Sequence, residues 1–412
     1  MMARRDPYDI QQIFEDMALA LITSMKRNFQ RHIREEMKEG FRWDRWQFVL
    51  LRSLNRFRGQ NSRIIQSAFR EAERLTESVL RESFEIGQRA AEQQIRQVMV
   101  GDRIAAAEVS GEVRLPIDEK PPPVTKGQKR PKISYSQLPR AAPETQFFGM
   151  NERKLTALQQ SVVSDLMQAE YGVLRKMDDV YRQVIYRAQA NMTAGAKTLR
   201  QAVDMAAKEF LERGIDSVTY KDGRKVNIAS WAEMALRTAS QRATFLGEGQ
   251  KRAEWGIYTV LMSAHDNCSP WCLPYQGTVL IDDVYTSISP EQAEEQSKEY
   301  GAPLLSEAMR NGAFHPNCRH TLTTFFPGIT QVPPPVDDAK AERMYRAEQH
   351  QRYIERNIRK YKRLVAGSLD EQNVQRYKRK LMEWEARMEE LLEAYPQLRR
   401  NRAREVDRTM VV

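Results

Sequence analysis

The fold class of this chain is decided by residues 9–39, which read DIQQIFEDMALALITSMKRNFQRHIREEMKE. Apolar side chains recur there every three or four positions, as they do along one face of an α-helix. They are Ile10, Phe14, Met17, Leu21, Met25, Phe29, Ile33 and Met37. Gly40 is expected to end the helix, because glycine is common just after helix C-termini. A helix this long favours a mainly α protein.

Two more helices are expected directly after this one. Residues 43–57 form an apolar-rich stretch that Gly59 should close. A third helix should run over 61–99, because Asn61 and Ser62 are good N-cap residues. Connections this short place neighbouring helices antiparallel, so a helical hairpin or bundle is predicted.

Helical periodicity returns in the middle of the chain, and short β-prone segments interrupt it. The pair Asp222-Gly223 between β-prone flanks is a strong signal for a hairpin with a two-residue turn. The expected elements are helices over 155–184 and 196–211, a hairpin over 218–228, a helix over 231–247 capped by Ser230, and a buried strand over 257–262. A small α+β lobe is therefore predicted within a helical chain.

Two long charged helices are predicted near the C-terminus, over 339–366 and 369–395, with Gly367 between them and Ser368 as the cap of the second. Their mixed charges favour an antiparallel hairpin with ion pairs between residues four apart. One stretch is strongly basic and is opposed only by Glu355. Its cations are Arg352, Arg356, Arg359, Lys360, Lys362 and Arg363. We predict that they contact nucleic acid or an acidic surface.

Composition divides the chain into five segments. Seven prolines between Pro116 and Pro143 leave little room for helix. The basic run Lys126–Lys132 within them is expected to be part of a solvated linker, and contact with phosphate or an acidic neighbour is the alternative. The segments are an N-terminal helical region (1–110), a Pro-rich extended arm or linker (111–146), a central helical region (147–214), a small α+β lobe with Cys and His (215–330), and a charged C-terminal helical hairpin (331–412). The predicted fold class is mainly α, with long helices and helical hairpins and this one small α+β lobe.

Charge and hydropathy indicate the environment of the chain. Its net charge of +10 over 412 residues favours a polyanionic partner, although no sequence-specific nucleic-acid-binding motif is present. The apolar run 17–22 is far shorter than the roughly 20 residues that span a bilayer. Because no signal peptide is recognisable either, we expect a protein that is made in a cytoplasm and has no membrane partner.

All three cysteines and three of the five histidines lie within residues 265–320. They form two short limbs, C-x3-C and H-x2-C-x-H, separated by a longer insertion, which is how tetrahedral zinc sites are often assembled. The candidate ligands of a structural Zn²⁺ are Cys268, Cys272, His315, Cys318 and His320. Three cysteines and one histidine from this set would complete a site. The alternative stays open that the cysteines are buried small hydrophobes and that the histidines satisfy backbone groups.

Catalytic interpretations of the same cluster have less support. A cysteine nucleophile with His315 or His320 as its base is conceivable, but three cysteines compete for the role and no oxyanion-hole loop is evident. No P-loop, G-x-G-x-x-G, G-x-S-x-G or H-E-x-x-H motif occurs. We therefore expect no enzyme. A metal-dependent nuclease or ejected effector that uses the cluster is the alternative.

An ordered series of motifs runs through the second half of the chain. VNIASWAEMALRTA (226–239) leads into SAHDNCSPWCLPYQG (263–277), which PNCRH (316–320) and FFPG (325–328) follow, and then the basic stretch QRYIERNIRKYKR (351–363). This succession resembles the phage minor capsid protein 2 family of tailed-phage head proteins. It is also similar to the broader Mu F-like head morphogenesis proteins.

The resemblance implies a minor structural protein of the virion, present in several copies inside the head. Its expected partners are the portal protein, the major capsid protein, and packaged DNA held by salt-sensitive, sequence-independent contacts. A role in head assembly, or in DNA packaging or ejection, is implied. The family implies no catalytic residue.

Overall fold

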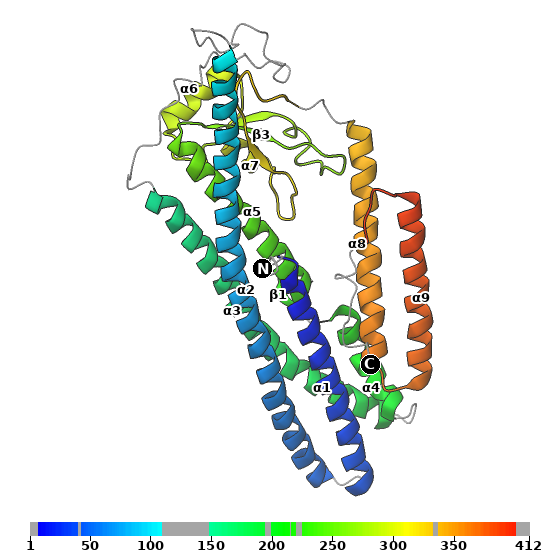
Figure 1. Ribbon diagram of the computed structural model, residues 1–412. Helices are drawn as coiled ribbons and strands as arrows, with labels where there is room; N and C mark the ends of the chain where they lie inside the picture. Colours follow the sequence, from blue (N-terminus) through cyan, green and yellow to red (C-terminus); the bar gives the residue numbers. More distant parts are fainter. Residues whose placement is uncertain are drawn as a thin grey trace. The chain divides into compact units, whose positions relative to one another are not determined.

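The structure is a computed structural model that describes residues 7–39, 43–108, 148–193, 199–214, 216–219, 225–332 and 337–400 (Figure 1). The predicted arm over 111–146 with its basic run, and the predicted turn Asp222-Gly223, lie outside the described residues. Among the described helices, none is both long and apolar enough to cross a membrane.

Long helices dominate the described chain, which confirms the predicted mainly α fold. The helices are α1 (Asp9–Glu39), α2 (Trp43–Glu108), α3 (Phe148–Thr193), α4 (Leu199–Arg213), α5 (Ile228–Glu254), α6 (Pro290–Tyr300), α7 (Leu305–Arg310), α8 (Asp338–Gly367) and α9 (Glu371–Ala394). The strands are β1 (Asp216–Thr219), β2 (Lys225–Asn227), β3 (Thr259–Met262), β4 (Val279–Ile281) and β5 (Leu322–Thr324). The expected hairpin is present as the antiparallel pair β1–β2, and the expected buried strand is β3.

Helix α2 runs without a break over 66 residues, so the prediction of two helices separated at Gly59 was wrong. Glycine in a helix interior costs only about 1 kcal/mol relative to alanine, and a well-packed apolar face outweighs that cost. Phe57 on one side of Gly59 and Ile65 on the other are both fully buried. Packing on both sides therefore carries the helix through the glycine.

Replacing Gly59 by alanine is expected to stabilise the protein by about 0.5–1 kcal/mol. The glycine is exposed, and a Cβ built on it would meet no atom within 4 Å, so alanine adds helix propensity without a clash. Urea unfolding followed by circular dichroism measures the change. A loss of stability would contradict the continuous helix.

Two predicted helix starts were also wrong, each by a few residues. Helix α5 begins at Ile228 and is capped by Asn227, whose Oδ1 accepts a hydrogen bond from the Ala229 amide at 3.0 Å. Helix α9 is capped by Asp370, whose Oδ1 accepts from the Asn373 amide at 3.0 Å. In both places a good cap residue lies close to the predicted one, Ser230 or Ser368, and composition does not distinguish them.

The described chain forms two compact units, each assembled from separated stretches of sequence. Unit 1 comprises residues 1–76, 162–233 and 347–412, and unit 2 comprises 77–161 and 234–346.

Aromatic rings fill the core of unit 1, where α1, α2 and α3 meet. The Tyr181 ring stacks on Phe57 with the centroids 4.1 Å apart and on Phe29 with the centroids 5.0 Å apart. Phe14 meets Phe69 edge-on at 4.9 Å. These side chains are almost fully buried, and burying a large aromatic ring contributes roughly 2–3 kcal/mol. The apolar face predicted for residues 9–39 therefore packs on α2 through Phe14 and on α3 through Phe29.

A buried carboxylate holds the turn between α8 and α9 in unit 1. The Asp204 side chain of α4 accepts hydrogen bonds from the amides of Leu369 at 2.7 Å and Asp370 at 3.0 Å. It also accepts from the Ser368 hydroxyl and from Asn373 Nδ2. Four donors to one carboxylate fix the reversal of the C-terminal hairpin.

A three-stranded antiparallel sheet with strand order β4-β3-β5 lies in unit 2. Val260 pairs with Leu280 on one side and with Thr324 on the other. Apolar residues of the sheet, of α6 and of the loops beside them form one cluster, which comprises Leu261, Val279, Ile281, Ile288, Ala293, Tyr300, Ala302 and Phe325. A core of this size positions the loops at the strand ends.

Helices α2 and α5 of unit 2 touch backbone to backbone through two glycines. A Cβ built on Gly87 would lie 2.1 Å from the Thr244 carbonyl oxygen. A Cβ built on Gly247 would lie 2.0 Å from the Phe84 carbonyl oxygen. Only glycine allows this separation, so the two positions are fixed by packing.

Unit 2 also contains a fully buried ion network around Arg252. Its guanidinium Nη2 lies 2.8 Å from Asp282 Oδ2, and Nη1 lies 3.4 Å from Glu248 Oε2. Asp282 Oδ1 accepts from the Tyr285 amide at 2.9 Å. The network therefore ties α5 to the loop after β4.

The stability of unit 2 is expected to fall as the pH rises from 4.5 through 7. Burial raises the pKa of Glu248 from 4.5 to about 7, against the opposing effect of Arg252. Below pH 4.5 the carboxyl is protonated in both the folded and the unfolded chain. Above it the unfolded chain ionises freely, whereas the folded chain must ionise a buried group, so about 2 kcal/mol is lost between pH 5 and pH 7.

Urea unfolding at the two pH values measures this loss. The Glu248→Gln variant should show a smaller difference, because its amide does not titrate. Arg252 and Asp282 also act on this group and stay unchanged in the variant. An equal pH dependence in wild type and variant would rule out Glu248 as its source.

Candidate metal centre

The two limbs of the Cys/His cluster are brought together by neighbouring strands of the unit 2 sheet. The first limb leaves β3 and the second limb leads into β5, and Met262 pairs with Leu322 where the strands meet the limbs. The Ser263 amide donates to the Thr321 carbonyl at 3.0 Å, and the Thr321 amide donates to Ser263 Oγ at 2.8 Å. Strand pairing thus joins segments that are far apart in the sequence.

Tight turns shape the first limb around Cys272. The Cys272 amide donates to the Ser269 carbonyl at 3.1 Å, and the Gln276 amide donates to the Cys272 carbonyl at 3.0 Å. Gly277 has φ of 69° and donates its amide to the Met262 carbonyl at 2.9 Å. A left-handed residue at this point favours glycine and returns the chain to the sheet.

The second limb turns at Asn317, and helix α5 holds it in place. The Cys318 amide donates to the His315 carbonyl at 2.9 Å, and Asn317 has φ of 68°, a conformation that asparagine tolerates better than most residues. Arg237 Nη1 donates to Asn317 Oδ1 at 3.2 Å, and Gln241 Nε2 donates to the His320 carbonyl at 2.5 Å. Residues 237 and 241 share one face of α5, so one helix face positions the whole limb.

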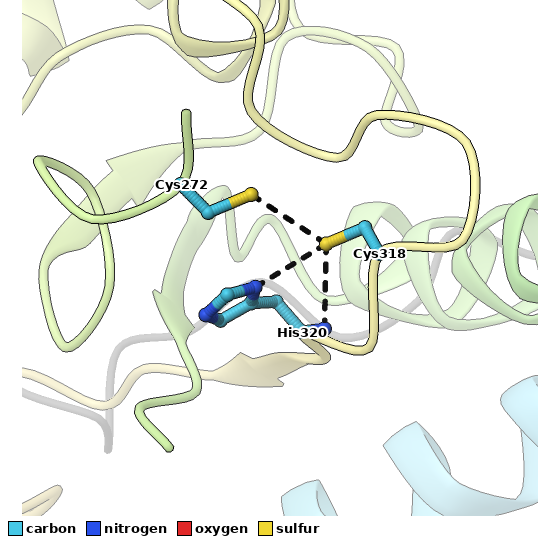
Figure 2. A group of neighbouring side chains, drawn as sticks. All are labelled: Cys272, Cys318 and His320. Atoms are coloured by element: carbon cyan, nitrogen blue, oxygen red, sulfur yellow. Dashed lines mark hydrogen bonds between the residues drawn. The ribbon is translucent and has the colours of Figure 1, made fainter. Parts of the chain in front are cut away.

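Three of the predicted ligands, Cys272, Cys318 and His320, meet in the interior (Figure 2). Their ligand atoms lie within 4.8 Å of one another, and all three residues are buried. The two Sγ atoms are 3.7 Å apart, and Cys318 Sγ lies 3.2 Å from His320 Nδ1. The His320 amide also donates to Cys318 Sγ at 3.4 Å.

The other two predicted ligands, Cys268 and His315, do not belong to this group of three. The Cys268 thiol is buried and donates to the Ser269 carbonyl at 3.3 Å. His315 hydrogen-bonds through Nε2 to Ser269 Oγ at 2.7 Å and through Nδ1 to the Pro316 carbonyl at 2.8 Å. Both residues have protein partners of their own.

His265 was not among the predicted ligands, yet it lies against the group. Its ring stacks on the His320 ring with the centroids 4.0 Å apart and an interplanar angle of 26°. Both ring nitrogens are inaccessible to solvent and have no hydrogen bond of normal geometry. The Asn267 side chain has only a small effect on the pKa of the ring. The sequence contained a signal for it, because His265-x2-Cys268 repeats the spacing of His315-x2-Cys318.

The protonation of the group follows from this packing. The hydrogen bond from Cys318 lowers the pKa of Cys272 and raises the pKa of Cys318, so the pair shares a single proton. Burial, with His320 and Arg319 nearby, lowers the pKa of His265 to about 4. A thiolate and a neutral imidazole are the forms in which these side chains bind metals.

Several cations in the basic stretch of α8 bind carbonyls or carboxylates of unit 1. Arg363 is buried and donates to the carbonyls of Leu211 at 3.1 Å and Glu212 at 2.9 Å. Arg359 lies 3.5 Å from Glu15, and Lys360 lies 3.2 Å from Glu212.

The remaining three predicted contact residues differ from one another in their exposure and in their partners. Arg352 pairs with Glu348 at 3.1 Å, Lys362 is half-buried, and Arg356 is exposed beside the Tyr353 ring. Most of the predicted contact set therefore neutralises or caps neighbouring elements, and Arg356 is the member most open to a partner.

A second basic surface lines a cleft of about 1200 Å³ in unit 1 between α1, α2 and the α8–α9 turn. Four of its cations are exposed and form no ion pair with any side chain that the structure describes. They are Arg27, Arg31, Arg63 and Lys378. The two carboxylates of the lining already accept hydrogen bonds, Asp16 from Gln12 and Glu371 from Gln375. An excess of unpaired positive charge therefore surrounds this cleft.

Comparison with known proteins decides what kind of protein carries these features. The sequence profile of the family described as Phage minor capsid protein 2 matches residues 124–393, well over half of the chain. The chain belongs to the phage minor capsid protein 2 family. The match includes both limbs of the Cys/His cluster and all of α8, which confirms the predicted resemblance.

A relative agrees with this family. The chain is 24% identical over 187 residues to a protein of Lactococcus phage LL-H described as "Structural protein". The alignment covers 44% of this chain and 48% of the relative, so the chain spans about half of the relative's length. No solved structure matches the chain.

Membership in the minor capsid protein 2 family gives the chain a structural role in a phage capsid. It indicates a protein of the virion. The names of the family and of the relative indicate a structural protein.

Proposed function

We propose that this minor capsid protein lies inside the phage head, near the portal and the packaged DNA, and acts in head assembly or in DNA packaging or ejection. Its family membership over residues 124–393 is the observation that carries the proposal. The partners are the portal protein, the major capsid protein or both, in several copies per virion. The long helices with mixed charges supply the surfaces for these contacts.

Limited proteolysis of phage heads tests the interior location. The protein should resist protease in intact heads and become sensitive once the heads are opened by chelation or osmotic shock. Chemical cross-linking of intact heads should join it to portal protein. Digestion in intact heads, or its absence from purified heads, would contradict the proposal.

The basic cleft of unit 1 supports contact with packaged DNA. Arg27, Arg31, Arg63 and Lys378 are exposed cations without an ion-pair partner among the described side chains, and they surround one concave surface. Phosphates of a nucleic-acid backbone supply the missing negative charge and release bound counterions, whatever the base sequence. The cleft is therefore our proposed DNA-contacting surface, with Arg356 of α8 as a further contact.

A fourfold variant tests this surface directly. Changing Arg27, Arg31, Arg63 and Lys378 to glutamine should weaken binding to linear duplex DNA and flatten its salt dependence. The slope of log K against log salt should fall by roughly 3 to 4, at about 0.9 for each phosphate contact.

The matched control changes the net charge equally on exposed residues of unit 2. It carries glutamine at Arg81, Arg89, Lys298 and Arg310. If both variants lose the same affinity, overall charge and not the cleft governs binding, and the proposed surface is wrong.

We further propose that the protein has no catalytic role. Cys272, Cys318 and His320 are buried and contact one another, a burial that suits a structural site. Purified protein incubated with plasmid DNA and Mg²⁺, Mn²⁺ or Zn²⁺ should leave the DNA intact. Cleavage that disappears in a folded His320→Ala variant would establish a nuclease instead.

A further inference from the structure

We propose that Cys272, Cys318, His320 and His265 bind one Zn²⁺ ion in a tetrahedral site that joins the two limbs. The proposal goes beyond the capsid role, and it takes three of its ligands from the five Cys and His side chains that were predicted from the sequence. It also adds a ligand, His265, which the sequence analysis did not include. Geometry, chemistry and unsatisfied polar atoms each support it.

The separation of the two cysteines fits a shared zinc ion. Zinc bonds thiolate sulfur at about 2.3 Å, so two sulfurs at corners of a tetrahedron are about 3.8 Å apart. Cys272 Sγ and Cys318 Sγ are 3.7 Å apart. A disulfide would need about 2.05 Å, and both cysteines are free.

His320 presents the correct nitrogen to this site. Its Nε2 faces Gln276 Oε1 at 3.5 Å, whereas its Nδ1 lies 3.2 Å from Cys318 Sγ. A proton on Nε2 that points at the Gln276 carbonyl leaves the lone pair on Nδ1 for the metal. Metal-binding histidines are commonly oriented by such an outer hydrogen bond.

His265 supplies the fourth ligand. Both of its ring nitrogens are buried without a hydrogen bond of normal geometry, a costly arrangement for a polar side chain. Its ring centroid lies 4.0 Å from that of His320, so the imidazole is adjacent to the group of three, and binding would need a side-chain rotation that turns a ring nitrogen toward the open corner. Gln276 Oε1 also accepts from the His265 amide at 3.3 Å, so one side chain positions both histidines.

Cys268 and His315 are left out of the ligand set because their donor atoms lie outside the group of three and have oxygen partners, although the His315 side chain also helps to lower the pKa of Cys272. The Cys268 thiol bonds the Ser269 carbonyl, and both ring nitrogens of His315 have oxygen partners at 2.7 and 2.8 Å. These two residues support the loops around the site. They also provide matched control variants, since each changes a Cys or a His in the same limbs.

The types of ligand indicate which metal ion the site would bind. Two thiolates and two imidazoles in a closed tetrahedron are typical of structural zinc, whereas Mg²⁺ and Ca²⁺ prefer oxygen ligands. The bound ion would join the end of β3 to the start of β5. A cross-link there would fix the two loops more firmly than the strand hydrogen bonds and the contacts from α5 do by themselves.

Metal analysis of the purified full-length protein tests the proposal. The wild-type chain, made without a metal-binding tag, should contain one zinc per chain, and Cys318→Ser should contain none. Cys268→Ser and His315→Asn should each retain one zinc. His265→Asn should bind zinc at least about tenfold more weakly in competition with a chromophoric chelator.

X-ray absorption at the zinc edge keeps the test valid if a variant fails to fold, because it uses the wild-type protein. Two sulfurs at about 2.3 Å and two nitrogens at about 2.0 Å are expected. A shell of three sulfurs would make Cys268 a ligand and overturn the proposed set. A reduced wild-type chain that takes up no zinc, or a Cys272–Cys318 disulfide in protein from reducing cytoplasm, would overturn the site itself.

Discussion

Replacing Asp282 by alanine is expected to lower the free energy of unfolding of unit 2 by about 3–5 kcal/mol. Arg252 and Asp282 are both fully buried, and their side chains meet at 2.8 Å. Without the carboxylate, the guanidinium keeps only the longer contact to Glu248, and the Tyr285 amide loses its acceptor. Hydrogen exchange of α5 peptides, read by mass spectrometry, measures the change locally.

An exposed ion pair of the same unit serves as the control. Lys340 and Asp266 meet at 2.5 Å with about half of each side chain in solvent, so Asp266→Ala should change stability by less than about 1 kcal/mol. The double variant Arg252→Met with Asp282→Asn should recover part of the loss, because it removes the uncompensated charge. Equal effects of Asp282→Ala and Asp266→Ala would show that burial of the pair is unimportant.

Replacing Gly87 by alanine is expected to destabilise unit 2 by about 3 kcal/mol, a large effect for a single methyl group. The new Cβ would lie 2.1 Å from the Thr244 carbonyl oxygen, and backbone on both sides leaves no flexible side chain to move away. The helices α2 and α5 would have to separate, which also loosens the contact at Gly247. Thermal unfolding and hydrogen exchange of α5 measure the loss.

Gly59→Ala is the matched comparison, since it makes the same substitution in the same helix at an open position. The two variants should change stability in opposite directions. A neutral Gly87→Ala variant would mean that the two helix backbones are not in contact at this point.

Much of the helical fold can be predicted from the sequence, because apolar periodicity over long stretches such as 9–39 has few alternatives. The ends of helices are harder to predict, because a glycine ends a helix only where the packed apolar face does not continue past it. At Gly59 the buried residues Phe57 and Ile65 continue the packed face on both sides. The cap positions Asn227 and Asp370 were missed for a related reason, because neighbouring serines have equal propensity and tertiary contacts select between them.

The candidate site was predictable as a region and not residue by residue. Spacing identified two limbs, and strand pairing of β3 with β5 brings them together. Which side chains turn inward depends on loop conformation, such as the left-handed Asn317, which composition does not encode. Likewise, the charge of Arg359, Lys360 and Arg363 was visible in the sequence, but their partners in α1 and α4 are distant in sequence.

The interleaved order of the two units has a consequence for synthesis. Unit 1 contains residues 1–76 and also residues 347–412, so it can be completed only after most of the chain has been translated. Unit 2 can close earlier, once residue 346 has emerged. During that interval α1, α2 and α3 can already pack on one another, but the side of α1 that meets Arg359 and Gly367 of α8 stays uncovered until the last stretch of the chain has been made.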